Sequence, residues 1–153
     1  NVASIMINRM LRGQQPVIYG DGSQRRCFSF IADVVPSLLR LGDDPAITSE
    51  VFNLGPDEQV TSILELAHEI AALLDFQLAP IFVPARPLEV HDAFCSSDKA
   101  RDLLGYRTTY TLREGLDRMV DWIRALGPRE FRYDYELEIR NDRIPRTWVE
   151  SII

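Results

Sequence analysis

The chain has 153 residues, 46% of them hydrophobic, and its 17 Lys and Arg residues against 23 Asp and Glu residues give a formal net charge of −6. This length and apolar content fit one globular domain and exclude a largely disordered chain. Without an uninterrupted apolar stretch of about 18 residues, no membrane span is predicted. We therefore expect no membrane as a partner, and because the acidic balance gives no electrostatic footprint for nucleic acid, we expect no nucleic acid either.

The cysteines and the start of the chain indicate the cellular compartment and whether the chain is part of a longer protein. Cys27 and Cys95 are too few for the disulfide framework of a small secreted fold, and no charged-then-apolar leader precedes them, so we expect a cytoplasmic protein. The chain opens at Asn1, without an initiator Met, directly into a predicted helix. We therefore expect it to be a fragment of a longer protein.

The first thirty residues predict a helix, a strand and a turn, in that order. Apolar side chains recur at helical spacing over residues 1–11, and the pattern stops at Gly13. Residues 16–19 form a short apolar run that the turn-favouring residues 20–23 close, so we expect a strand ending in a tight turn. Residues 27–31 are a second candidate for extended structure.

The next segment predicts a helix and a β-rich run. Asp33 can cap a helix over residues 34–41 that ends at Gly42, with Pro36 tolerated in its first turn. After a loop, residues 50–55 form a compact run that favours a strand.

The second half contains the two clearest helices. Each begins with a capping box, in which a Ser or Thr is followed three residues later by Glu. The boxes and the helices that follow them are Ser62 with Glu65 before residues 63–74, and Thr111 with Glu114 before residues 112–126. Between these helices, residues 79–83 predict a strand and residues 98–104 a short helix closed by Gly105. This alternation of strands and helices predicts the α/β class.

A different pattern follows the last predicted helix. Over residues 131–139, apolar and charged side chains alternate with period two, which favours a strand or extended arm with one buried face. We therefore divide the chain into a domain over residues 1–126 and an extended C-terminal arm over residues 127–153. Two interpretations of the arm stay open, an ordinary packing arm or a contact in a homodimer.

The sequence gives little support to hydrolysis, metal catalysis or cofactor binding. His68 lies off the apolar face of its predicted helix and His91 lies in a loop, so we expect a solvated or packing role for both. No Cys-x-x-Cys or His-x-x-x-His spacing is present for a metal. Residues 20–22 (Gly-Asp-Gly) begin a dinucleotide fingerprint, but Arg25 stands where the third Gly is required and no helix follows the string.

Anion recognition by arginine is the remaining chemistry. Arg25 and Arg26 follow the Gly-rich turn, and Arg86 lies between Pro84 and Pro87, which stiffen the backbone around it. A guanidinium matches two phosphate oxygens at once, and a rigid loop lowers the entropy cost of holding it in place.

Four strings of the sequence match a known family in order and spacing. They are residues 16–35 (PVIYGDGSQRRCFSFIADVV), 51–55 (VFNLG), 86–90 (RPLEV) and 97–106 (SDKARDLLGY). On these strings the chain resembles the extended short-chain dehydrogenases (SDRs), and among them the NAD-dependent nucleotide-sugar epimerases and dehydratases of the UDP-glucose 4-epimerase type. The resemblance covers residues 1–126.

The resemblance implies both a fold and a role. The fold would be the C-terminal, substrate-binding part of an extended Rossmann-type α/β fold, with mixed short strands and helices and without the Gly-rich nucleotide-binding half. This part would grip the nucleoside diphosphate of a UDP-sugar or a related nucleotide sugar. Carried over residue by residue, the expected contacts are Asn1 at the phosphate region, Val17 and Tyr19 around the base, Arg26 and Arg86 as a clamp on the diphosphate, and Glu89 as the acceptor of a ribose hydroxyl.

Three residues depart from the family's pattern. Cys27 replaces the commoner Asp after the clamp arginine, and the resulting Arg-Cys-Phe is similar to UDP-glucuronate decarboxylase domains. Leu88 stands where Gly is usual, and Glu89 is one methylene longer than the usual Asp.

The family's catalytic pair is absent from this sequence. That pair is Tyr-x-x-x-Lys, whereas the single lysine here, Lys99, has Cys95 four residues before it. The resemblance thus implies an enzyme whose own N-terminal Rossmann half supplies the pair and binds NAD or NADP, and we expect residues 1–153 alone to be inactive. Decarboxylase and dehydratase activities, or a non-catalytic sugar-nucleotide-binding module, stay open beside an epimerase.

Overall fold

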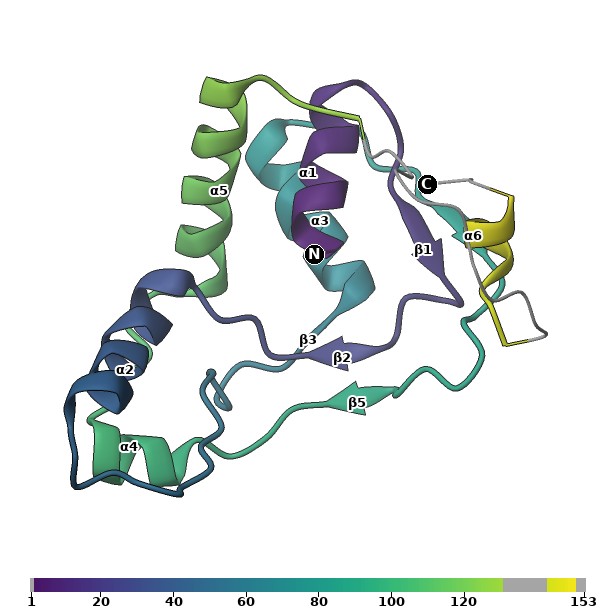
Figure 1. The fold of residues 1–153 in the computed structure, drawn as a ribbon. Coiled ribbons are helices and arrows are strands. Elements are labelled where there is room, and N and C mark those ends of the chain that lie inside the picture. The colour runs from purple at the N-terminus through teal and green to yellow at the C-terminus, as the bar shows by residue number, and fades with distance from the viewer. Residues whose placement is uncertain (1, 131–142, 151–153) are drawn as a thin grey trace.

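The computed structural model describes residues 2–130 and 143–150. Its elements in chain order are α1 (Val2–Leu11), β1 (Val17–Tyr19), β2 (Arg25–Arg26), α2 (Ile31–Asp43), β3 (Thr61–Ser62), α3 (Ile63–Leu74), β4 (Ile81–Val83), β5 (Asp92–Ala93), α4 (Asp98–Leu104), α5 (Leu112–Leu126) and α6 (Arg146–Val149). Helices α1, α3 and α5 pack together, and α2 with α4 forms a separate group at the other end of the molecule (Figure 1). The mixture of helices and short strands confirms the predicted α/β class.

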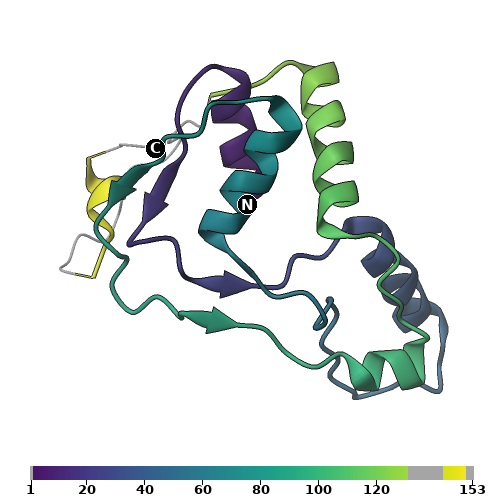
Figure 2. The same cartoon turned by 180° about the vertical axis from the view of Figure 1, so that it is seen from behind.

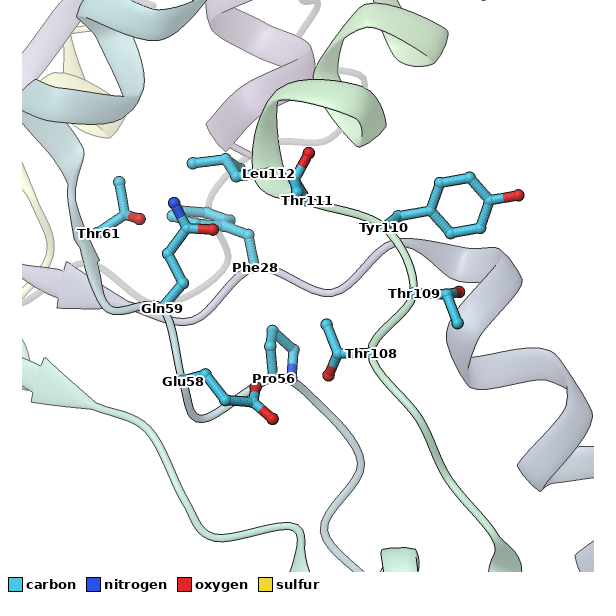
Figure 3. Close-up of a pocket in the computed structure, with 10 residues that line it drawn as sticks. All are labelled: Phe28, Pro56, Glu58, Gln59, Thr61, Thr108, Thr109, Tyr110, Thr111 and Leu112. Atoms are coloured by element: carbon cyan, nitrogen blue, oxygen red, sulfur yellow. The ribbon is translucent and has the colours of Figure 1, made fainter.

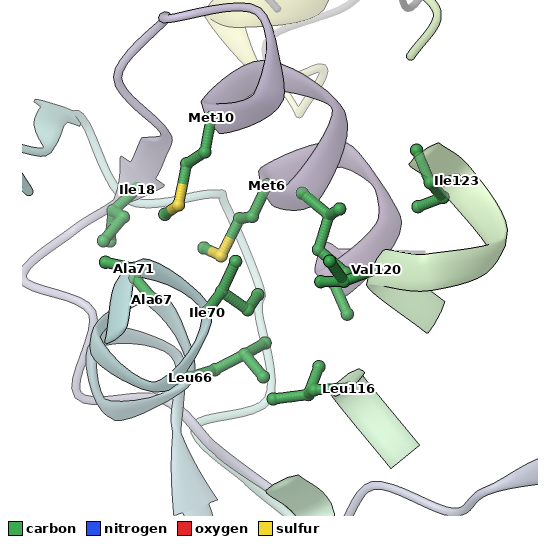
Figure 4. Close-up of a cluster of buried hydrophobic side chains, with 12 residues drawn as sticks. Met6, Met10, Ile18, Leu66, Ala67, Ile70, Ala71, Leu116, Val120 and Ile123 are labelled. Carbon is green, nitrogen blue, oxygen red and sulfur yellow. The ribbon is translucent and has the colours of Figure 1, made fainter. Parts of the chain in front are cut away.

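One hydrophobic core joins α1, α3, α5 and β1 (Figure 4). Met6 and Met10 of α1 point toward α3, because apolar residues at helical spacing place one face of each helix against the next. The buried members are Ala3, Met6, Ile7, Met10, Ile18, Leu66, Ala67, Ile70, Ala71, Leu116, Val120 and Ile123. In the described ranges 2–130 and 143–150, no helix has the length and apolar character to cross a membrane.

Both predicted capping boxes are present. At the start of α3, the Glu65 amide donates to Ser62 Oγ at 3.1 Å and the Ser62 amide donates to Glu65 Oε2 at 2.7 Å. Thr111 and Glu114 exchange the equivalent bonds at the start of α5. These bonds satisfy amides that a helix start leaves without a partner, so the beginnings of both helices are fixed locally.

The strands form two small sheets that bring distant loops together. β1 pairs in parallel with β4, and β2 lies between β3, which is antiparallel to it, and β5, which is parallel to it. The β1–β2 connection and the β4–β5 connection therefore run side by side, as Figures 1 and 2 both show. This topology places the residues around Arg26 next to those around Glu89.

The predicted bounds of two elements in the region of α2 were wrong. Residues 27–31 are not a strand, because the pairing with β3 and β5 occurs earlier, at Arg25 and Arg26, and α2 already begins at Ile31. α2 is also longer than predicted, so Pro36 lies in its interior.

Asp33 does not cap α2. It lies inside the first turn, and its carboxylate accepts hydrogen bonds from the Thr109 hydroxyl and from the amides of Thr109 and Tyr110, at 3.1 Å and 3.2 Å for the amides. The side chain thus joins α2 to the segment before α5 instead of closing its own helix.

The predicted β-rich run over residues 50–55 contains no strand. Phe52 and Leu54 instead pack against a small cluster whose buried members are Ala100, Leu104 and Tyr106. Apolar side chains that meet a helix from an irregular segment leave the same pattern in the sequence as a short strand. The alternating pattern of residues 131–139 lies outside the described residues.

Candidate functional site: an arginine-lined cleft

A cleft of about 340 Å³ opens where α1, β1 and the two parallel connections meet. Five residues that the sequence predicted as contacts line it: Val17, Tyr19, Arg26, Arg86 and Glu89. Asn1 lies outside the described residues, and its neighbour Val2 is part of the wall. The remaining lining residues are Ile5, Met6, Gln24 and Ile63. We refer to these residues together as the arginine cleft.

Arg86 has no carboxylate partner among the described residues. Its guanidinium carbon lies 3.9 Å from the centre of the Tyr19 ring, a cation–π contact. Its Nε is buried and has no hydrogen-bond partner in the described structure. A buried donor without an acceptor is costly, which makes this group a candidate for contact with an acceptor that the described residues do not supply.

Arg26 is held in place by backbone oxygens. Its Nη1 donates to the Arg25 carbonyl at 2.7 Å and to the His91 carbonyl at 2.9 Å. Its Nη2 lies 3.5 Å from Glu89 Oε1, a longer ion pair that leaves much of the positive charge available. The side chain is 25% exposed, so a ligand can reach it from the cleft.

Arg25 differs from its neighbour because its charge is already paired. Its Nε donates to Asp92 Oδ1 at 2.7 Å. This contact raises the pKa of Arg25 and lowers the pKa of Asp92. Of the three arginines that the sequence singled out, Arg25 therefore belongs to the surface, whereas Arg26 and Arg86 face the cleft.

Gln24 is a residue of the cleft that sequence reasoning missed. Its Nε2 donates to the Tyr19 carbonyl at 2.7 Å and to Glu89 Oε2 at 3.3 Å, and its Oε1 is buried without a partner among the described residues. The cleft thus contains an unsatisfied acceptor as well as the unsatisfied Arg86 donor. The available signal was a polar residue between a Gly-rich turn and the arginines, which does not by itself indicate burial.

The two histidines have the surface roles that were expected. His68 is an exposed residue of α3. His91 is exposed, with Nε2 3.1 Å from Ser23 Oγ and Nδ1 3.2 Å from Asp92 Oδ1. Its backbone carbonyl, and not its ring, contributes to the cleft by holding Arg26.

The glycines of residues 20–22 lie in a closely packed turn. They lie in the connection from β1 to β2, so the chain continues from them into a strand and not into a helix. The first turn of α3 packs against this string, with the Leu64 amide donating to the Gly22 carbonyl at 3.0 Å. Gly22 has a φ of +78°, and a Cβ there would lie 3.0 Å from side-chain atoms of Ile18 and Leu64. The described residues at this string therefore lack the strand–turn–helix order that a dinucleotide-binding string requires.

A second cleft, of about 310 Å³, lies beside Phe28 (Figure 3). Its lining is mainly threonines and neutral residues from the segments 56–61 and 108–112, with Glu58 as its charged member. None of the residues predicted from the sequence lines it. Its negative charge and lack of arginine do not favour a phosphate group.

Comparison with known proteins gives the chain its class. The model of the protein family described as GDP-mannose 4,6 dehydratase matches residues 2–119. A putative UDP-glucose 4-epimerase of Methanocaldococcus jannaschii is 33% identical over 123 residues, which are 80% of this chain and 39% of that protein. UDP-glucuronic acid decarboxylase 4 of Arabidopsis thaliana is 34% identical over 119 residues, 78% of this chain and 26% of that protein.

Solved structures agree on the fold. The UDP-glucose 4-epimerase of Thermotoga maritima with UDP-glucose superimposes with a TM-score of 0.74 at 29% identity, over 82% of this chain and 40% of that one. The UDP-glucuronic acid 4-epimerase of Bacillus cereus, in complex with UDP-glucuronic acid and NAD, gives 0.77 at 27% identity, over 83% and 40%.

The fold is therefore that of part of an extended SDR, as the sequence predicted. More narrowly, the chain belongs to the GDP-mannose 4,6 dehydratase family, whose members similar to this chain are nucleotide-sugar epimerases and decarboxylases. It spans 26% to 39% of the length of the two curated relatives described above.

Proposed function

We propose that the arginine cleft binds the nucleoside diphosphate of a UDP-sugar or related nucleotide sugar. Arg26 and Arg86 contact the diphosphate, and Val17 and Tyr19 frame the base. Glu89 accepts a hydrogen bond from a ribose hydroxyl, once the ligand competes with Arg26 and Gln24 for its oxygens. Asn1 contributes at the phosphate region.

The observation that carries the proposal is the state of Arg86. Its guanidinium is stacked on Tyr19, lacks a carboxylate partner among the described residues, and has a buried, unsatisfied Nε. Arg26 and Arg86 together with Glu89 leave the cleft with a net positive charge, the sign that a diphosphate requires. Two of the solved structures similar to this chain contain UDP-sugars, which supports this ligand class.

We further propose that the chain acts within an NAD- or NADP-dependent enzyme, in the first place an epimerase. A decarboxylase or a dehydratase of the same family is the alternative, and the relatives include both epimerases and decarboxylases. In this scheme the described residues bind and orient the substrate, while the Rossmann half of the same protein holds the cofactor and the Tyr and Lys. The inactivity of residues 1–153 alone, a homodimer and a cytoplasmic location remain predictions.

Calorimetric titration with UDP tests the binding. Arg86→Ala is expected to weaken UDP binding about 10- to 100-fold, because a hydrogen-bonded charge contact is lost. Arg113→Ala is the matched control, since Arg113 is an exposed arginine that pairs with Glu69 outside the cleft. It should leave UDP affinity unchanged. The proposal would be wrong if the unaltered protein did not bind UDP, or if Arg86→Ala bound UDP as tightly as the unaltered protein.

A further inference from the structure

A second aromatic ring approaches the Arg86 guanidinium from an unexpected part of the chain. The guanidinium carbon lies 5.9 Å from the centre of the Trp148 ring. Trp148 belongs to α6 (Arg146–Val149), which lies beyond residue 119, the last residue that the family model matches. Figures 1 and 2 both show α6 beside β1 and β4, the strands that lead into the arginine cleft.

The start of the C-terminal segment is fastened to α1. The Arg129 amide donates to Asn8 Oδ1 at 2.7 Å, and Arg12 Nη2 lies 3.1 Å from Glu130 Oε1. α1 also lines the arginine cleft. The described start of the C-terminal segment thus packs on a helix that lines the cleft, and Trp148 of α6 lies beside Arg86.

Two aromatic rings beside an arginine restrain it in a different way than a carboxylate partner does. A carboxylate would neutralise the guanidinium and would compete with a diphosphate for its N–H groups. Rings attract the cation through their faces and exclude water, but they accept no strong hydrogen bond from its edge. Tyr19 and Trp148 can thus restrict the orientations of Arg86 while its charge stays available.

We propose that Trp148 is a positioning residue for the anion-binding arginine, so that α6 completes the arginine cleft for a nucleoside diphosphate. This inference rests on the proposed function. Trp148 acts by narrowing the range of Arg86 orientations before the ligand arrives, which lowers the cost of ordering that side chain on binding. Helix α6 is then a part of the binding site.

The experiment compares UDP affinities of tryptophan variants by calorimetry. Trp148→Ala is expected to weaken UDP binding about threefold to tenfold, the size of a partly exposed cation–π contact, and Trp148→Phe is expected to restore most of the loss. The protein contains two tryptophans, and Trp122 on α5 is 64% exposed. Trp122→Ala is therefore the matched control and should bind UDP like the unaltered protein.

A double variant separates positioning from direct contact. If Trp148 acts through Arg86, then Trp148→Ala causes no further loss when it is added to Arg86→Ala. An equal loss in both backgrounds would overturn the inference, because Trp148 would then touch the ligand on its own. So would an affinity of Trp148→Ala equal to that of the unaltered protein, or a failure of Trp148→Phe to recover any binding.

These outcomes are distinct from failure of the proposed function. If UDP does not bind the unaltered protein, or if Arg86→Ala binds it equally well, the ligand assignment fails and this inference fails with it. If UDP binding depends on Arg86 but not on Trp148, the ligand assignment stands and only the role of α6 is lost.

Discussion

At the scale of single residues, the loop that carries Arg86 contains backbone strain. Leu88 has a φ of +59°, in the left-handed region that costs a residue with a Cβ about 1–2 kcal/mol. The turn is closed by the Glu89 amide, which donates to the Arg86 carbonyl at 3.4 Å. Leu88 is 84% exposed, so burial of its side chain does not offset the strain. Leu88 thus has the left-handed conformation that a Gly, the residue usual at this position in the family that the sequence resembles, adopts without penalty.

Leu88→Gly is therefore expected to stabilise the protein. Relief of the left-handed strain, less the added entropy of glycine in the unfolded chain, amounts to about 0.5–1 kcal/mol in the free energy of unfolding. Urea denaturation followed by circular dichroism measures it. Leu88→Ala is the control, because alanine keeps the strain and removes the exposed side chain; a glycine variant no more stable than the alanine variant would contradict the strain.

Five of the residues that line the cleft were predicted from the sequence, because they occur in contiguous strings. Val17, Tyr19 and Arg26 belong to one string and Arg86 and Glu89 to another, and the parallel pairing of β1 with β4 unites the two. Gln24 and Trp148 were missed for physical reasons. The burial of Gln24 depends on long-range contacts with Tyr19 and Glu89, and Trp148 lies in a segment without a recognisable motif.

At the scale of elements, the sequence predicted helix starts that depend on neighbouring residues. It did not predict structure that depends on contacts between residues far apart in the chain. The capping boxes of α3 and α5 span four residues each, so the sequence contains all of their chemistry. Asp33 looked like a similar local cap, but its partners are Thr109 and Tyr110, far along the chain. The pairs β2–β3 and β2–β5 involve two residues per strand, too few for a periodic pattern to appear.

Asp33→Ala tests the link between α2 and the segment before α5. The carboxylate is buried and accepts from the Thr109 hydroxyl and two amides, so its removal leaves these donors unsatisfied. We expect the free energy of unfolding to fall by about 2–3 kcal/mol, as for hydrogen bonds to a charged group. Chemical denaturation measures this loss.

Asp43→Ala, an exposed position in the last turn of α2, controls for removing an aspartate from the same helix. It should change stability by less than about 0.5 kcal/mol. If the two variants are equally stable, the hydrogen bonds between Asp33 and the segment before α5 do not contribute to the free energy of unfolding.

At the scale of the whole molecule, the two packing groups are connected by polar contacts as well as by the chain. The group formed by α1, α3 and α5 has the large core, and the group formed by α2 and α4 has the small one (Figure 1). Arg101 of α4 contacts Asp57, Glu58 and Asp98. Asp57 precedes β3, which leads directly into α3. The cluster therefore connects α4 to the segment that continues into the group formed by α1, α3 and α5.

Among the carboxylates of this cluster, Asp57 has the largest change in pKa. Arg101 donates to both of its oxygens, and the Ser97 amide donates to Oδ2 at 2.9 Å. These contacts lower the pKa of Asp57 from 3.8 to about 2. A carboxyl group whose pKa is lowered by folding stabilises the folded state above its unfolded pKa, and this contribution is lost as the pH falls through the folded pKa.

Asp57→Asn is therefore expected to destabilise the protein in a pH-dependent way. The variant should unfold at lower urea than the unaltered protein near neutral pH, and the difference should shrink as the pH falls from 3.8 toward 2, because the native Asp57 loses its charge over that interval. Urea midpoints measured across this range test it. Asp102→Asn, which removes an exposed carboxylate from the same helix, corrects for the general effect of net charge in acid. A difference for Asp57→Asn that stays constant with pH, or one that Asp102→Asn reproduces, would show that the charge of Asp57 does not fasten α4 to the rest of the molecule.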